Sequence, residues 1–251
     1  MKIMRVLNND KPSWAIEEGG TAYAMLGDPY SSPTKGASLG PVDGLKILSP
    51  VLPENKVIVL LANWGDREDR DWPAFIIKPA SARINPGETV IYPKIAARVY
   101  FETELGIVVG KKCKDITPQQ ARDHILGYTI SNDITAFEFT KKIGPFGILF
   151  GKGFDTFSVL GPCIATDVDP TNLMIRGKLN GEQFFETNSG LMLWNAYEIV
   201  SWVSQVMPLF PGDVISCGAP PGALTKPTLP GDHIAAIIDG IGTIENPVRP
   251  E

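Results

Sequence analysis

The chain has 251 residues, of which 43% are hydrophobic and 20% charged, a composition typical of a folded domain and not of a disordered chain. Its formal net charge is −5 and no basic stripe runs along it, which argues against a nucleic acid partner. The longest purely apolar run, residues 57–62, is far shorter than the roughly 20 residues that cross a bilayer, so we expect no membrane partner. Three widely spaced cysteines favour a reducing, cytoplasmic location.

The first 53 residues differ in character from the rest and predict a small β-rich N-terminal subdomain, followed by a catalytic domain over residues 54–251. Short strands are expected at residues 3–6, 13–17 and 21–25. A stretch rich in Pro, Ser and Gly predicts a loop at residues 28–38, and residues 48–53 are interpreted as a linker.

The chain contains 25 glycines and 22 prolines, which predicts many tight turns between short strands. Three segments share a Pro-Gly pair that fits the centre of a type II turn, residues 85–88, 210–213 and 229–232. The pairs Asn180-Gly181 and Asp239-Gly240 lie between apolar runs and predict hairpin turns.

Two helices are predicted. The first begins at the cap Thr117, with Pro118 at its first position and Gln120 completing a capping box, and we expect it to reach about Leu126. The second covers residues 196–206 and ends before Pro208.

Residues 98–110 predict a strand that carries two carboxylates on one side. Because side chains alternate across a strand, Glu102 and Glu104 point the same way and could converge on one ion. The alternative is a solvated face of an amphipathic strand, since Glu-x-Glu is a common pattern.

Two further polar residues stand in unusual positions. Asp133 lies in an apolar extended segment, where a carboxylate is costly unless something compensates it, although it could also cap a turn. Lys152 lies between two glycines, which allow close backbone approach, although the segment could equally be a surface turn.

Taken together, these residues resemble the fumarylacetoacetate hydrolase family over most of residues 57–248. The resemblance is carried by the order and spacing of several short motifs: Glu102-Thr103-Glu104-Leu105 with residues 108–111, Gly127-Tyr128 with Asn132-Asp133, residues 151–157 with Gly161-Pro162, Asn180-Gly181-Glu182, residues 211–215, and residues 217–220.

The resemblance implies a fold, a metal and a set of site residues. The fold is α+β but mostly β, a mixed β-sheet roll with few short helices, and the protein is implied to be a homodimer. The metal is Mg²⁺, with Mn²⁺ or Ca²⁺ as alternatives, and its implied ligands are Glu102, Glu104 and Asp133. Lys152 is implied to hold a substrate oxygen or to move a proton.

The sequence departs from the family pattern where hydrolytic and decarboxylating members carry a water-activating His and Glu. Arg67 and Arg70 stand there, and arginine is always protonated, so it is no ordinary general base. A shifted acidic residue (Asp66, Glu68 or Asp69) could substitute, the arginines could clamp a substrate anion, or residues 66–71 could form a solvated loop or a lid. The two histidines, His124 and His233, are interpreted as structural.

Three further positions lose polarity relative to the family, at Phe137, Phe185 and Ala219. Together with Gly218, they are predicted to contact the substrate. If so, the pocket suits a larger and less acidic compound than a short dicarboxylic keto acid, although Phe137 and Phe185 could instead be ordinary core.

The chemistry implied for the small-molecule substrate is metal-assisted enolisation of a β-dicarbonyl or 2-oxo acid-like compound, with stabilisation of its enolate. C–C bond hydrolysis, decarboxylation and tautomerisation all follow from that step. The alternatives are a cyclase-like or other tailoring enzyme of secondary metabolism acting on a bulky apolar natural product, and a non-catalytic binding descendant.

Overall fold

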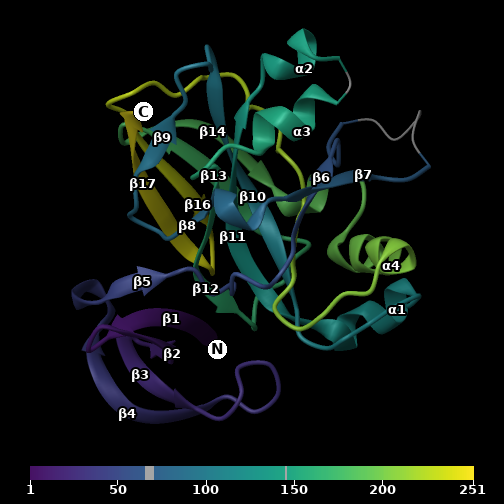
Figure 1. Cartoon of the computed structure of the whole chain (residues 1–251). Helices are drawn as coiled ribbons and strands as arrows, with labels where there is room; N and C mark the ends of the chain where they lie inside the picture. The colour runs from purple at the N-terminus through teal and green to yellow at the C-terminus, as the bar shows by residue number, and fades with distance from the viewer. Residues whose placement is uncertain (66–70, 145) are drawn as a thin grey trace.

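The structure, a computed structural model, describes residues 1–65, 71–144 and 146–251 (Figure 1). Most of the regular backbone is β-strand, arranged in two mixed sheets with few and short helices, which confirms the predicted fold class. No helix in these described ranges is long and apolar enough to cross a membrane.

The larger sheet has twelve strands. Ten of them pair in the order β4-β3-β2-β1-β12-β11-β10-β15-β6-β7, with β5 beside β1 and β8 beside β12. Their bounds are β1 (Lys2–Asn8), β2 (Lys11–Glu18), β3 (Thr21–Leu26), β4 (Thr34–Pro41), β5 (Lys46–Leu48), β6 (Val57–Leu61), β7 (Ala74–Lys78), β8 (Arg83–Ile84), β10 (Val99–Val109), β11 (Ile125–Ala136), β12 (Ser158–Ala165) and β15 (Val214–Ser216).

The smaller sheet has five strands in the order β14-β13-β16-β17-β9. These are β9 (Val90–Tyr92), β13 (Met174–Leu179), β14 (Glu182–Asn188), β16 (His233–Ile238) and β17 (Gly242–Pro250). The helices are α1 (Pro118–Ala121), α2 (Phe139–Lys142), α3 (Gly147–Lys152) and α4 (Ala196–Val206), with 3-10 turns η1 (Val42–Gly44), η2 (Ala80–Ala82), η3 (Arg122–His124) and η4 (Ser189–Leu191).

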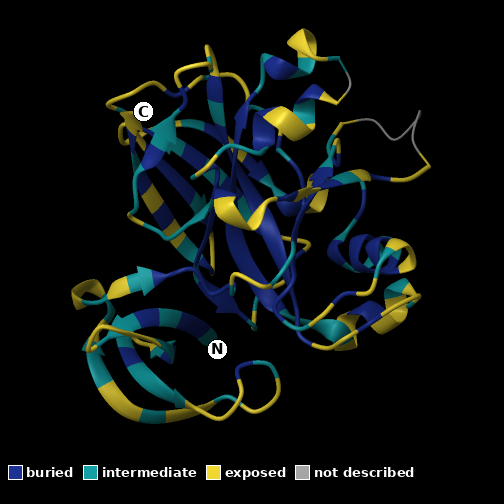
Figure 2. Ribbon diagram, viewed as in Figure 1, coloured by how far each residue is buried: buried dark blue, intermediate teal, exposed yellow. Residues whose placement is uncertain are grey.

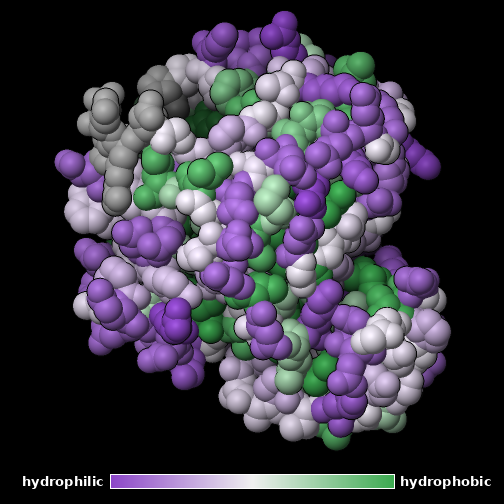
Figure 3. Space-filling view, turned by 180° about the vertical axis from the view of Figure 1, so that it is seen from behind, coloured by the Kyte–Doolittle hydropathy of each residue, from purple (hydrophilic) through white to green (hydrophobic). Residues whose placement is uncertain are grey.

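Strands β1 to β4 form a lobe that projects from the main body (Figures 1 and 3). The lobe continues the larger sheet, because β1 pairs with β12 at Lys2↔Ala165 and Ile3↔Ile164. The loop predicted at residues 28–38 is wrong in its second half, where β4 begins at Thr34. This strand pairs irregularly with β3 and lies at the sheet edge, where the Gly and Pro that suggested a loop are tolerated.

The predicted turns are confirmed. In the three Pro-Gly turns the glycines Gly87, Gly212 and Gly231 have φ between +81° and +97°, as the second centre of a type II turn requires. The two hairpin turns join β13 to β14 and β16 to β17. The capping box at Thr117 is also present.

The helix predicted to start at Thr117 is shorter than expected. It gives way to η3, and β11 begins at Ile125, because from there the backbone hydrogen-bonds into the central sheet. The second predicted helix matches α4 at both ends.

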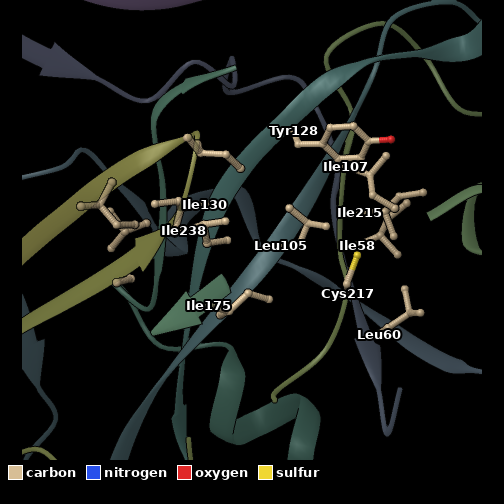
Figure 4. Close-up of a cluster of buried hydrophobic side chains, with 14 of the residues drawn as sticks. Ile58, Leu60, Leu105, Ile107, Tyr128, Ile130, Ile175, Ile215, Cys217 and Ile238 are labelled. Atoms are coloured by element: carbon tan, nitrogen blue, oxygen red, sulfur yellow. The ribbon is translucent and has the colours of Figure 1, made fainter. Parts of the chain in front are cut away.

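The hydrophobic core surrounds the two strands that carry the predicted carboxylates. Strands β10 and β11 run through the middle of the molecule and are buried along almost their whole length (Figure 2). Side chains of these strands, such as Leu105 and Ile130, share one hydrophobic cluster with Ile58 of β6 and with Ile175 and Ile238 of the smaller sheet (Figure 4). A polar group on β10 or β11 therefore lies out of water and needs a partner within the protein.

Helix α4 allows a direct test of the local sequence signals. The Asn195 side chain accepts hydrogen bonds from the backbone N–H groups of Tyr197 and Glu198, and the Asn195 N–H donates to the Glu198 carboxylate. We expect Asn195→Ala to lower the free energy of unfolding by about 1 kcal/mol, measured by chemical denaturation. The exposed Gln119 is the control, and Gln119→Ala should change stability by less than about 0.5 kcal/mol. Equal effects of the two substitutions would refute the capping role.

Candidate metal centre

Three carboxylates converge at the middle of β10 and β11. Asp133 stands directly opposite Glu102 in the ladder, and Glu104 stands opposite Ser131, so all three side chains share one face. Each carboxylate offers an oxygen within 4.8 Å of the others, and the three residues are between 0% and 2% exposed. The alternatives of a solvated strand face and of a turn-capping Asp133 therefore do not describe this structure.

The segment after β15 holds Glu104 in place. The Ser216 hydroxyl lies 2.5 Å from Glu104 Oε2, and the Gly218 N–H donates to the same oxygen at 2.7 Å. Gly218 has φ +90°, and a Cβ there would lie 3.1 Å from the Leu60 carbonyl oxygen, so a glycine is needed for this approach. On the other carboxylate of the pair, the Thr135 hydroxyl donates to Glu102 Oε1 at 2.7 Å.

Lys152 lies inside the cluster and not in a surface turn. It ends α3, is 3% exposed, and its Nζ donates to Asp133 Oδ2, to Glu102 Oε2 at 3.0 Å and to the Thr135 hydroxyl at 2.7 Å. The predicted site lysine and the three predicted ligands are thus brought together from three separate segments of the chain.

Sequence reasoning missed a second buried lysine. Lys78 Nζ lies 2.5 Å from Asp133 Oδ1 and also donates to the Phe157 carbonyl oxygen at 2.7 Å. A signal was present, because Lys78 ends the apolar strand β7 and has the same parity as the buried Ile76, which places it on the inward face. A lysine at such a position is unusual unless it is paired.

Burial and the neighbouring charges shift the pKa values of the cluster in different directions. Burial, reinforced by the carboxylates of Asp133 and Glu102, raises the pKa of Glu104 well above its usual range, and burial also raises the pKa of Glu102. Burial acts on Asp133 too, but Lys152 and Lys78 outweigh it and lower the pKa of Asp133. Burial opposes the Lys152 ammonium, but Asp133 and Glu102 outweigh it and raise that pKa, whereas burial prevails at Lys78 and lowers its pKa.

The cluster fits a hard divalent cation. Five of the six carboxylate oxygens accept hydrogen bonds, and the sixth, Glu104 Oε1, has no partner in the described part of the chain although it is buried. Carboxylate oxygens are the ligands that Mg²⁺, Mn²⁺ and Ca²⁺ prefer, and an added positive charge would compensate the carboxylate that the lysines do not touch.

The remaining predicted site residues lie in different surroundings. Ala219 is half-buried in the turn that follows Gly218. Phe137 has the same parity as Asp133 and Thr135 on β11, packs edge-on against Tyr100, and lines a cavity of about 150 Å³. Phe185 is buried in the core.

The packing of Phe185 is tight, because a Cβ on Gly177 would lie 2.1 Å from its ring. Arg67 and Arg70, together with the acidic residues 66, 68 and 69, lie outside the described residues. Of the two histidines, His233 is exposed at the start of β16, and His124 Nδ1 lies 3.3 Å from the Lys111 carbonyl oxygen.

A mostly β roll with a buried Glu-Glu-Asp cluster on its central strands defines the class of the protein as a candidate metal-dependent enzyme. Residues 59–249 match the fumarylacetoacetate (FAA) hydrolase C-terminal family. The chain therefore belongs to the fumarylacetoacetate hydrolase family.

Among the proteins similar to this chain, some have names that describe an activity and others do not. The crystal structure of 5-carboxymethyl-2-hydroxymuconate delta-isomerase from Mycobacterium smegmatis is 34% identical, covers 100% of both chains and superposes with a TM-score of 0.91. Oxaloacetate tautomerase fahd2 of Xenopus laevis mitochondria is 35% identical over 218 residues, which are 81% of this chain and 68% of that protein. Protein Rv2993c of Mycobacterium tuberculosis is 36% identical over 264 residues, covering 99% of this chain and 98% of its own.

Glu104 gives a prediction that separates metal binding from simple structural burial. In metal-free buffer we expect Glu104→Gln to keep or raise the melting temperature, because it removes a buried carboxylate that the neighbouring acids repel. Adding Mg²⁺ or Mn²⁺ at 100 times its dissociation constant should stabilise the wild type by about 2.7 kcal/mol, and Glu104→Gln should lose most of this gain.

The measurement is a thermal melt in EDTA and in excess metal. Glu245→Gln, at an exposed position of β17, is the matched control and should behave as the wild type does in both buffers. A metal-dependent rise in Glu104→Gln equal to that of the wild type would rule out Glu104 as a ligand.

Lys78 gives a second prediction. Lys78→Met should lower the free energy of unfolding of the metal-free protein by about 3–5 kcal/mol, because it leaves Asp133 Oδ1 without its cation. Excess metal should restore part of the lost free energy of unfolding, since a bound cation compensates the same carboxylate. Chemical denaturation with and without Mn²⁺ measures both effects, and Lys111→Met, at an exposed position, is the control. A metal-free stability equal to that of the wild type would show that Lys78 does not compensate the cluster.

Proposed function

We propose that the protein is a divalent-metal-dependent enzyme that binds an enolisable 2-oxo acid or β-dicarbonyl compound and catalyses its tautomerisation. The observation that carries the proposal is the buried Glu102, Glu104 and Asp133 cluster with Lys78 and Lys152 against it. Five charged side chains are costly to keep out of water, and a binding or catalytic role accounts for their retention better than stability does.

The charges of the cluster favour an anionic substrate. A divalent cation at the three carboxylates would supply Lewis-acid chemistry, polarising the paired oxygens of the bound compound. Three carboxylates and two ammonium groups carry one net negative charge, which becomes one net positive charge once a divalent ion is included. We therefore infer a substrate that carries a carboxylate or that reacts through its enolate anion.

Other residues of the chain contact the substrate or position the carboxylates. Lys152 Nζ uses its three N–H groups on Glu102, Asp133 and Thr135. On substrate binding, one of these bonds is released and Lys152 donates instead to a substrate oxygen as negative charge develops on it. Thr135 orients Glu102, and Lys78 fixes Asp133, so both are positioning residues. The burial of the whole cluster excludes bulk water, which strengthens these interactions.

The arginines at positions 67 and 70 favour tautomerisation over hydrolysis. Hydrolysis needs a base that activates water, and arginine cannot serve as an ordinary base. A tautomerisation moves a proton within the substrate and consumes no water. The resemblance to a named tautomerase and to a named isomerase supports this choice.

A second candidate function is a tailoring reaction, such as cyclisation, on a bulkier and more apolar compound. It draws on Phe137, which directly follows β11, packs edge-on against Tyr100 and lines a cavity with it. Turnover of a short dicarboxylic keto acid at an ordinary enzymatic rate, about 1 per second or faster, would count against this second candidate.

Oxaloacetate and an acylpyruvate form the test panel. We expect metal-dependent ketonisation of enol-oxaloacetate above its spontaneous rate, followed by ultraviolet absorbance, and loss of that activity in EDTA. Lys152→Met should lower the rate about 100-fold or more while keeping a metal-dependent rise in melting temperature, which shows that the variant is folded. Lys111→Met is the control and should leave the rate unchanged.

The panel also separates the reaction types. Release of pyruvate from the acylpyruvate, faster than any tautomerisation, would replace the proposal by C–C hydrolysis. Inactivity on both compounds in the presence of bound metal would reject the proposed substrate class.

A further inference from the structure

A second candidate binding site lies where the N-terminal lobe meets the main body, and its Arg83 pairs with Ser158, the residue of β12 that pairs on its other side with Asp133. A cavity of about 310 Å³ opens there. It is bordered by four segments: β1 and β2 of the lobe, the residues from β5 to Pro53, and the stretch from η2 to Asn85. Its walls include Arg5, Leu48, Ser49, Arg83, Ile84 and Asn85.

The two arginines of this cavity are held by backbone carbonyl groups. Arg5 Nη1 donates to the Ser49 carbonyl oxygen at 2.9 Å, and the Arg5 guanidinium lies 5.7 Å from the centre of the Trp14 ring. Arg83 Nη2 donates to the Asn55 carbonyl oxygen at 2.8 Å, and its Nη1 donates to that of Leu52. Within residues 1–65, 71–144 and 146–251, neither guanidinium has a carboxylate in ion-pair contact.

Among the residues that the structure describes, these bonds leave most of the donors of both arginines without a partner. A guanidinium has five N–H groups, of which the bonds above occupy one in Arg5 and two in Arg83. Both side chains are half-buried, and burial lowers the pKa of each, while the carboxylate of Glu54 partly opposes that effect. Two positive charges are therefore partly removed from water without a full counter-charge.

We propose that this cavity binds a phosphate dianion, either free or as the monoester of a small organic compound. The planar forks of two guanidiniums match the oxygens of a phosphate, and its two negative charges balance theirs. Because Arg5 belongs to β1 and Arg83 to β8, the bound anion would link the N-terminal lobe to the main body. The site is separate from the carboxylate cluster and does not rest on the proposed enzymatic function.

The test is a thermal melt of the whole protein in metal-free buffer, titrated with inorganic phosphate at pH 8 against sodium chloride and acetate of equal ionic strength. We expect saturable stabilisation by phosphate that acetate does not reproduce. Arg5→Gln should weaken phosphate binding at least tenfold, whereas Arg249→Gln, at an exposed position of β17, should bind as the wild type does. Glu54→Gln should tighten binding, because it removes a negative charge that acts on both arginines.

Two further arms complete the test. Lys152→Met should keep the full phosphate effect, and its loss there would move the anion to the carboxylate cluster and overturn the proposal. Arg83 also holds the Leu52 and Asn55 carbonyl groups, so Arg83→Gln can destabilise the fold. The phosphate affinity of this variant is therefore measured by calorimetry below its melting temperature, and we expect it to fall as that of Arg5→Gln does.

Glycerol 3-phosphate separates the two sources of the phosphate group. Tighter binding than inorganic phosphate assigns the site to an ester, and weaker binding assigns it to the free ion. Equal stabilisation in Arg5→Gln and wild type would refute the site.

Discussion

The centre of this protein is organised around three carboxylates that have been removed from water. Glu102, Glu104 and Asp133 lie on the long, mostly buried strands β10 and β11, where each unpaired charge would cost several kcal/mol. The surrounding fold supplies compensation from three distant segments, with Lys78 from β7, Lys152 from α3 and Gly218 from the segment after β15. The sheet order that brings β15 beside β10 is therefore also what assembles the site.

The negative charges of the three carboxylates are compensated unequally, Asp133 most and Glu104 least. Lys78 and Lys152 both contact Asp133, whereas Glu104 receives only a hydroxyl and a backbone N–H on one of its oxygens. The pKa of Asp133 is accordingly lowered while that of Glu104 is raised. The uncompensated side of the cluster is thus the Glu104 side, which is where an additional positive charge gains most.

Membership of the family does not by itself determine which reaction this chain catalyses. The match over residues 59–249 shows the family, and proteins similar to this chain include a named isomerase and a named tautomerase. This chain departs from the family pattern at Arg67, Arg70 and Phe137. One fold can serve different reactions, because the reaction depends on the individual residues of the site and not on the fold itself.

Local patterns in the sequence were sufficient for the turns, for α4 and for the shared face of Glu102 and Glu104, because each depends on residues at most a few positions apart. The family motifs also identified Asp133 and Lys152. Lys78 and the end of α1 at Ala121 were not found, and β4 was taken for a loop. These features depend on long-range pairing: Lys78 is explained only by Asp133, 55 residues away, and the helix ends where the central sheet begins to bind the backbone. Tertiary contacts thus fixed which charges meet, because compensation of a buried charge depends on distance in space and not on spacing along the chain.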